Sequence, residues 1–554
     1  MINQQPLKQE GIGPQMVNLP HEIIQLIFSF IPDAYLETYI DIPFIGEYAV
    51  DIVYRFISII ASHWECNVYW PVRRKGSNLI SKHVFNDQDN PETREGVFYK
   101  YLRVNQFIQL ISNHPRFTPD IVQFRQFDRF LWLHQRYPDI LKRFPRIDIS
   151  FIGEGLSSPA LLFDMQYNNI YRVSSLPEQF GYNDKLFSNI SSLHTMSLPK
   201  WAGQNWCENI QELELELESG PYDELSRLFP NLKRLDLLDY SEKSLKNLPL
   251  SLEFLMVKFD DSSEEFDISS DEFDISYLAN LREFIARTYS SRFNLFKFPL
   301  GVERVLLLDE YFQESPGDPR DVFLSMELYP NLKEYGIVLQ GDYYTTSMFS
   351  YNATCPQSVQ NLEIVVNNTI GVRDLSTIGE FLKLPEKLRY FQFAAYDAQT
   401  LLEKLVLPPS LRVLSISDYA STGPCSDMED WSGVKFPDSL VQLNLEVSIP
   451  EGLVLPKSLH SLSVFSASLF TSLNLLEFEN LVQLKYSCYE SLEFIYKLPT
   501  NLKTLDLSWA ENLNKMIIEA PNLHRVNLAW TGLKYLDPSH FRLPDCVESL
   551  AIRV

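Results

Sequence analysis

The sequence predicts an α/β solenoid, in which stacked repeats each contribute one strand to a parallel concave sheet, preceded by a small all-α domain. One observation is a pattern, apolar-Pro-x-(x)-Leu-x-x-Leu-x-Leu, that recurs to the end of the chain. Its clearest copy is residues 230–237, which follow Phe229. A second observation is an apolar segment with helical spacing near the N-terminus, at residues 19–31.

The repeat count carries more weight than any single copy. Successive units are separated by 19 to 30 residues, a period typical of repeat proteins. Weaker copies occur at Leu193 and Ile210. The fourteen clear units begin at Leu232, Leu252, Leu281, Val302, Leu332, Val359, Leu388, Leu411, Leu440, Leu459, Leu481, Leu502, Leu523 and Val547.

Each x-Leu-x-Leu segment predicts one short strand, because alternate side chains of a strand point to opposite faces. The leucines then point inward and the residues between them point outward. Proline fixes its own φ and cannot donate to a sheet, so the apolar-Pro pair marks the turn that enters each strand. A single repeat cannot bury its leucines, whereas stacked neighbours can.

This pattern resembles the leucine-rich-repeat family in its Leu-Pro-x-x-Leu-x-x-Leu-x-Leu form, most closely at 407–411, 455–459 and 498–502. The resemblance implies a curved solenoid with a parallel sheet on its concave side, and we assign residues 151–554 to it. The family often places asparagine or cysteine three residues after the last leucine. This chain instead has Tyr240, Tyr419, Ser448, Ala510 and Thr531.

Composition narrows the class of protein. The chain has 554 residues, of which 45% are hydrophobic, so we expect it to fold. A formal charge of -24 disfavours nucleic acid and favours partners with basic segments. The six cysteines form no CxxC pair, which indicates reduced thiols and no metal site. No apolar signal core and no run of about 18 apolar residues occurs, so we expect no membrane association and a cytoplasmic or nuclear location.

Residues 1–17 are predicted to be a flexible tail, and a helix is predicted after them. Asn18 is a suitable cap, Pro20 suits a first helical turn and Pro32 ends the helix. The apolar residues at helical spacing are Ile23, Ile24, Ile27, Phe28 and Ile31.

This segment resembles the start of the F-box, an adaptor module that docks on the Skp1 subunit of cullin-RING ubiquitin ligases. The resemblance implies that the matching residues contact Skp1, namely Leu19, Pro20, Glu22, Ile23, Ile27, Phe28 and Pro32. A second apolar segment with helical spacing, 49–64, ends at Trp64, so we assign 18–75 to an F-box-like helical domain. The alternative is that the first helix caps the solenoid.

Residues 76–150 are predicted to be a loop followed by a helical linker. The loop prediction rests on glycine, asparagine and proline within 76–97. Residues 97–144 interleave aromatic residues with arginine, a pattern that can bind nucleic acid by stacking. Asp120, Asp128 and Asp139 interrupt the basic residues, so we favour the linker.

No nucleotide-binding or hydrolase motif occurs in the sequence, and no cofactor is expected. Cys425 and Asp427 form a Cys-x-Asp sequence that resembles the catalytic signature of bacterial ubiquitin ligases with similar repeats. In that family the cysteine lies after the repeats, whereas here the repeats continue past Cys425. We therefore predict a protein without catalytic activity.

The outward residues of the strands are the predicted substrate-binding surface. They are Arg234, Asp236, Phe254, Met256, Tyr390, Gln392, Gln442, Asn444, Thr504, Asp506, Arg525 and Asn527. The sequence thus suggests a substrate-recognition adaptor of a Skp1-cullin-F-box ubiquitin ligase, with a Skp1-like protein, a cullin and a protein substrate as partners. The alternatives are a scaffold protein whose first helix caps the solenoid and, more remotely, an enzyme that uses Cys425.

Overall fold

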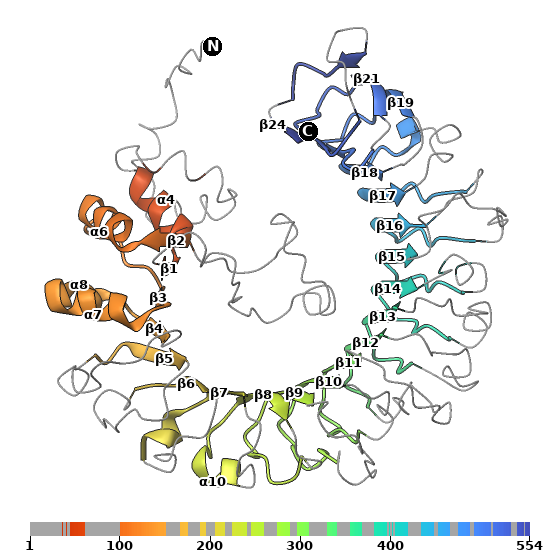
Figure 1. Ribbon diagram of the computed structural model, residues 1–554. Helices are drawn as coiled ribbons and strands as arrows, with labels where there is room; N and C mark the ends of the chain where they lie inside the picture. The colour runs from red at the N-terminus through yellow and green to blue at the C-terminus, as the bar shows by residue number, and fades with distance from the viewer. Residues whose placement is uncertain are drawn as a thin grey trace. The chain divides into compact units, whose positions relative to one another are not determined.

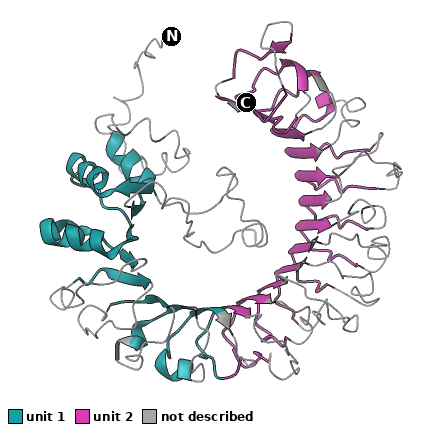
Figure 2. Ribbon diagram, in the orientation of Figure 1, with its two compact units in different colours: residues 1–78, 86–238, 247–252 teal, residues 79–85, 239–246, 253–554 magenta. Residues whose placement is uncertain are grey.

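The computed structural model spans residues 1–554. The residues it describes are 36, 40, 45–60, 100–150, 167–174, 189–195, 205–216, 224–240, 245–259, 274–288, 296–309, 329–340, 355–367, 382–395, 398, 402, 405–418, 434–447, 453–465, 475–487, 492–510, 513–532, 540–547 and 549–553. The chain divides into two compact units (Figure 2). Unit 1 comprises residues 1–78, 86–238 and 247–252, and unit 2 comprises 79–85, 239–246 and 253–554.

Unit 1 contains a parallel sheet in which β1 lies between β2 and β3, and the later strands follow in sequence order (Figure 1). Alternate side chains such as Ile57 and Ile59 are buried in its core. The strands are β1 (Phe56–Ile60), β2 (Lys100–Arg103), β3 (Ile121–Phe124), β4 (Ile147–Ser150), β5 (Ile170–Ser174), β6 (Ser192–Thr195), β7 (Glu212–Glu216) and β8 (Arg234–Tyr240), of which β8 belongs to unit 1 up to residue 238.

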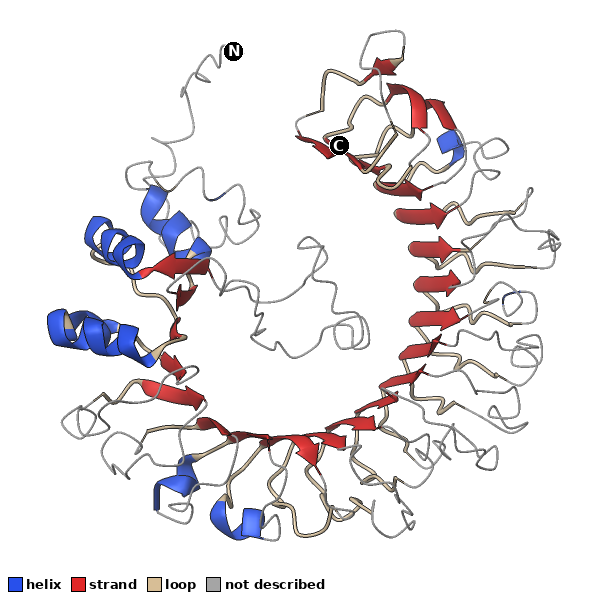
Figure 3. Cartoon of the chain, in the orientation of Figure 1, coloured by secondary structure: helices blue, strands red, loops and turns tan. Residues whose placement is uncertain are grey.

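Short helices lie before and between the strands of unit 1 (Figure 3). They are α4 (Ile45–Val53), α6 (Val104–Asn113), α7 (Phe127–Arg136), α8 (Pro138–Arg143), the 3₁₀ helix η5 (Asn205–Asn209) and α10 (Leu225–Leu228). Aromatic residues pack α6 and α7 into the core: the rings of Phe124 and Phe130 are 5.4 Å apart, and those of Phe107 and Phe144 are 5.7 Å apart. Pro138 lies in the first turn of α8, where its missing N–H is not needed.

Two predictions for this region need correction. The helix expected over 49–64 ends at Val53, and Phe56–Ile60 forms strand β1, so residues 18–75 are not purely helical. Strands β2, β3 and β4 lie within the stretch predicted to be a helical linker, and β4 pairs with β5 across the predicted boundary at 151. For β1 the physical reason is the alternation at 57–59, where the two isoleucines are buried on one face and Ser58 projects from the other.

Unit 2 contains a longer parallel sheet whose strands lie side by side in sequence order (Figure 1). Its strands are β9 (Phe254–Phe259), β10 (Glu283–Thr288), β11 (Arg304–Asp309), β12 (Glu334–Gln340), β13 (Asn361–Asn367), β14 (Tyr390–Ala395), β15 (Val413–Asp418), β16 (Gln442–Glu446), β17 (Ser461–Phe465), β18 (Gln483–Ser487), β20 (Thr504–Asp506), β22 (Arg525–Ala529) and β24 (Ser549–Arg553). A second sheet pairs β19 (Leu492–Lys497), β21 (Leu513–Glu519) and β23 (Phe541–Arg542). The short 3₁₀ helix η11 (Leu475–Glu477) precedes β18.

The repeat pattern predicts the strands closely. Each of the fourteen predicted units is followed by a strand that begins two residues after the first leucine or valine, as Leu440 precedes β16 at Gln442. The predicted turn is also present, because the N–H of Leu440 donates to the carbonyl of Pro437 at 3.1 Å and most other units repeat this bond. The weak copy is predicted at Leu193, which lies inside β6. The residue two positions before this strand, equivalent to the first leucine of the clear units, is Ile190. The α/β solenoid prediction is confirmed.

A row of hydrogen-bonded serines and asparagines joins consecutive repeats at the position just before the first leucine. Serines there donate to the leucine carbonyl of the preceding repeat, as Ser439 does to Leu411 at 2.7 Å. Asparagines there donate instead to the carbonyl two residues before that leucine of the preceding repeat, as Asn501 does to Glu479 at 2.7 Å. Ser251, Ser410, Ser458, Asn231, Asn331, Asn480 and Asn522 make the same kinds of bond. These bonds pair carbonyl groups that the sheet itself leaves without a donor.

Candidate protein-binding surface

The candidate site is the face of the unit 2 sheet opposite the buried leucines. Two rows of side chains run along it from β14 to β22, and their alignment follows from the strand register. The first ladder is Tyr390, Val413, Gln442, Ser461, Gln483, Thr504 and Arg525. The second ladder is Gln392, Ser415, Asn444, Ser463, Lys485, Asp506 and Asn527.

Every residue of the two ladders is exposed or half-buried, while the leucines between them are buried. The ladders carry hydroxyl, amide and charged groups, with Val413 as the apolar exception. Amides and hydroxyls can both donate and accept hydrogen bonds, so such a surface suits a protein or an extended peptide better than a small apolar ligand.

The structure brings together most of the residues predicted for substrate binding. Tyr390, Gln442 and Arg525 lie on the first ladder, as does Thr504. Asn444, Asp506 and Asn527 lie on the second ladder, together with Gln392. Gln442 and Arg525 are exposed, and the others are half-buried.

Hydrogen bonds hold several ladder side chains in place. The amide of Asn444 donates to the Ser415 hydroxyl at 3.0 Å, and the Tyr390 hydroxyl donates to the Gln392 carbonyl oxygen at 2.6 Å. Burial, with the nearby charge of Glu363, raises the pKa of Tyr390 far above its usual value. Tyr390 is therefore a neutral hydrogen-bond donor at physiological pH.

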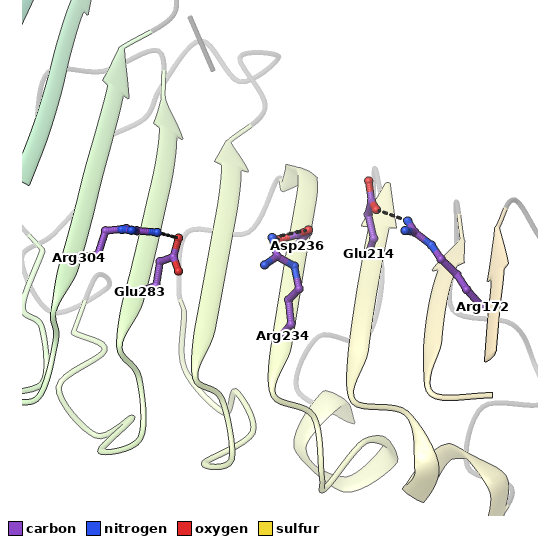
Figure 4. A network of polar contacts seen from close by, with 6 residues as sticks. All are labelled: Arg172, Glu214, Arg234, Asp236, Glu283 and Arg304. Carbon is purple, nitrogen blue, oxygen red and sulfur yellow. Dashed lines mark hydrogen bonds and ion pairs between the residues drawn. The ribbon is translucent and has the colours of Figure 1, made fainter. Parts of the chain in front are cut away.

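The beginning of the unit 2 sheet differs from these ladders. Here the outward positions hold Phe254, Met256, Ile285 and Leu306, and all four side chains are buried. The predicted contact residue Phe254 is thus inaccessible in this structure, as is Met256. Beside them, Arg304 pairs with Glu283 at 2.9 Å (Figure 4) and with Glu334 at 2.6 Å. This ion triad was not predicted, although the alternation of the repeat places its members on the outward face.

Arg234 and Asp236, also predicted for substrate binding, belong to unit 1. Arg234 Nη2 lies 3.3 Å from Asp236 Oδ1 on the same strand, and Asp236 is buried (Figure 4). On the same sheet, Arg172 Nη2 pairs with Glu214 Oε2 at 3.3 Å across the intervening strand. These charges neutralise one another within unit 1.

A buried polar chain that sequence reasoning missed runs across β1, β3 and β4 of unit 1. Ser58 donates to Gln123 Oε1 at 2.9 Å, and Gln123 Nε2 donates to Asp148 Oδ2 at 3.1 Å. Burial raises the pKa of Asp148, against the opposing effects of Arg172, Gln123 and His194. The sequence signal was weak, because these strands lack the Pro-x-x-Leu turn of the later repeats.

Several predicted residues lie outside the part of the chain that the structure describes. They include all the predicted Skp1 contacts, Leu19, Pro20, Glu22, Ile23, Ile27, Phe28 and Pro32, and the cysteine Cys425. Within the described residues, no group of three or more His, Cys, Asp or Glu side chains could hold a metal ion. No helix among the described residues is long and apolar enough to cross a membrane.

The fourteen motif copies, each with its turn and its parallel strand, decide the type of fold. The fold is a leucine-rich-repeat solenoid. No protein-family model matches its sequence, and no curated protein matches it.

Solved structures similar to this chain include two of YopM. For the leucine-rich effector YopM from Yersinia pestis, the sequence identity is 17% and the TM-score is 0.32, over 59% of this chain and 84% of that one. For YopM from Yersinia enterocolitica, the identity is 17% and the TM-score is 0.30, over 74% of this chain and 87% of that one.

Proposed function

We propose that the chain recognises a protein partner through the two ladders of unit 2. The observation that supports this function most directly is the run of polar, accessible side chains on strands β14 to β22, held on a regular parallel sheet. Such a surface offers donors and acceptors at strand spacing, about 4.8 Å, which suits an extended backbone or a folded surface. The formal charge of -24 favours a partner with basic segments.

We further propose that the chain is a substrate-recognition adaptor of a Skp1-cullin-F-box ubiquitin ligase. The support is the resemblance of Leu19, Pro20, Ile23, Phe28 and Pro32 to the F-box. The mechanism is proximity: residues 19–32 hold the ligase through a Skp1-like protein and its cullin, and the ladders hold the substrate. Bringing the two together raises their effective concentration, so the adaptor itself needs no catalytic residue and no cofactor.

The test is co-purification of the full chain with Skp1. A variant carrying Leu19→Ala, Pro20→Ala and Ile23→Asp is expected to lose Skp1, because the substitutions remove apolar contact area and place a charge in the docking segment. A matched control carries Asn444→Ala and Asp506→Ala in the ladders, and it should retain Skp1. Circular dichroism checks that both variants fold.

Failure of the intact chain to bind Skp1 would overturn the adaptor proposal. Protein binding through the ladders would then belong to the alternative function, a non-catalytic scaffold whose N-terminal helix caps the solenoid.

A further inference from the structure

Two tryptophans occupy the same position in consecutive repeats, just after β20 and β22. The local sequences are Asp506-Leu-Ser-Trp509 and Asn527-Leu-Ala-Trp530. In each, the side chain of the first residue accepts the N–H two residues later: Ser508 N to Asp506 Oδ1 is 2.8 Å, and Ala529 N to Asn527 Oδ1 is 3.1 Å. This bond closes a tight turn, a known role of Asp and Asn side chains.

The turns place both tryptophans in an unusual backbone conformation. Trp509 has a φ of 68° and Trp530 a φ of 60°, in the left-handed region that bulky side chains avoid. Among the described non-glycine residues, only Asn247 shares a positive φ. Glycine or asparagine would adopt this conformation more easily, so the backbone alone does not explain why tryptophan occupies both positions.

The two indoles form an exposed stacked pair. Their ring centroids are 5.5 Å apart and their planes differ by 16°. Trp509 is 50% exposed and Trp530 is 43% exposed, although large aromatic residues usually bury most of their surface. An aromatic pair that holds each other in place while remaining open to solvent is a preorganised stacking surface.

Charge on the neighbouring ladder selects the ligand. Asp506 ends strand β20 three residues before Trp509, and its Oδ1 is used in the turn. Its Oδ2 makes no hydrogen bond or ion pair within the described part of the chain. Lys485 lies opposite Asp506 on β18, and Asn527 lies opposite it on β22. A guanidinium group can stack on an indole ring and donate to a carboxylate oxygen, and the sequence places the Asp506 carboxylate three residues before Trp509.

We propose that the Trp509–Trp530 pair, with Asp506, binds an arginine side chain of a protein partner. The inference rests on the proposed protein-binding function and assigns a chemical preference to the end of its surface. Lysine is a weaker match, because its ammonium group cannot stack as a plane. The overall negative charge of the chain favours the same choice.

The test uses the full chain labelled with 5-fluorotryptophan, whose eight tryptophans give separate fluorine resonances in NMR. The probe is a short glycine-serine peptide carrying two arginines. The control probe is the same peptide with citrulline, a neutral isostere of arginine, in both positions. Single Trp509→Phe and Trp530→Phe variants assign the two resonances.

The expected result is a saturable shift of the Trp509 and Trp530 resonances with the arginine peptide, at least about tenfold weaker with citrulline. The Asp506→Asn variant should weaken arginine binding by about tenfold while retaining the turn, since asparagine makes the same bond at 527. Lys485→Ala should strengthen it, because a competing positive charge is removed.

Loss of the rings is tested with Trp509→Asn and Trp530→Asn together, because asparagine tolerates a positive φ and should keep the fold. Binding to this variant is measured with an arginine peptide that carries a fluorescent dye, and it should disappear. Equal binding of the citrulline peptide, unchanged binding by the double Trp509→Asn, Trp530→Asn variant, or shifts spread evenly over all tryptophans would each overturn the proposal. None of these readouts involves Skp1, so they fail independently of the adaptor proposal.

Discussion

Gln123 and Gln442 both project from the outward face of a parallel strand, yet they serve different purposes. Gln123 lies on β3 of unit 1, is buried, and joins Ser58 to Asp148. Gln442 lies on β16 of unit 2 and is exposed on the first ladder. One strand geometry therefore presents an internal hydrogen-bonded chain in one unit and a surface open to a partner in the other.

The core beneath both glutamines should be equally important. Ile149→Ala in unit 1 and Leu443→Ala in unit 2 each truncate a buried side chain, and each is expected to cost about 2–5 kcal/mol. Amide hydrogen exchange of the strands measures the loss locally, which suits a repeat protein whose unfolding need not be two-state. A loss below about 1 kcal/mol at either site would show that its core is not packed as described.

Replacing the two glutamines should change the stability of the two units by different amounts. Gln123→Ala leaves Ser58 and the buried Asp148 without their shared partner and should destabilise unit 1 by about 1–3 kcal/mol. Gln442→Ala is the matched control and should change stability by no more than about 0.5 kcal/mol. The same exchange measurement applies, and equal effects at the two sites would contradict the contrast.

Asp148 gives the buried chain a pH dependence. Because burial raises its pKa in the folded state, the folded protein binds a proton more readily than the unfolded chain. The contribution of protonated Asp148 to the free energy of unfolding is present below the usual carboxyl pKa, and it is lost as pH rises through the raised pKa of the folded state. Asp148→Asn should therefore become progressively more favourable relative to the parent as pH rises from acid to neutral. Urea unfolding of both proteins over that range checks it, and a difference independent of pH would contradict it.

The hydrogen bonds that the serines and asparagines make between repeats should contribute smaller amounts to the free energy of unfolding. Ser439→Ala removes the hydrogen bond to the Leu411 carbonyl and should cost about 1 kcal/mol. Ser461→Ala, on the half-buried first ladder, is the control and should stay within about 0.5 kcal/mol. Hydrogen exchange in β15 and β16 distinguishes the two, and a neutral Ser439→Ala would show that water replaces the bond.

The motif-bearing repeats could be predicted from sequence because each turn has a chemical signature. Proline before Leu440, for example, fixes the turn, and the alternation of Leu443 and Leu445 fixes the buried face. The outward register of Asn444, Asp506 and Asn527 followed directly.

The first strands of unit 1 could not be predicted in this way. Val50, Val53 and Ile57 fit a helical period as well as a helix followed by a strand, and the choice depends on the neighbouring strands β2 and β3. The burial of Phe254 could not be read from its position in the repeat either. Strand alternation gives the direction of a side chain but not its exposure.

If the chain joins a ligase to a substrate through separate surfaces, as we propose, each surface can be inactivated without the other. Epitope-tagged parent chain, the docking-segment variant at Leu19, Pro20 and Ile23, and the ladder variant at Asn444 and Asp506 would be purified in parallel, and their bound proteins quantified by mass spectrometry. We expect the first variant to lose Skp1 and cullin but retain the other partners, and the ladder variant to show the reverse. Loss of both sets in either folded variant, or of neither, would contradict it.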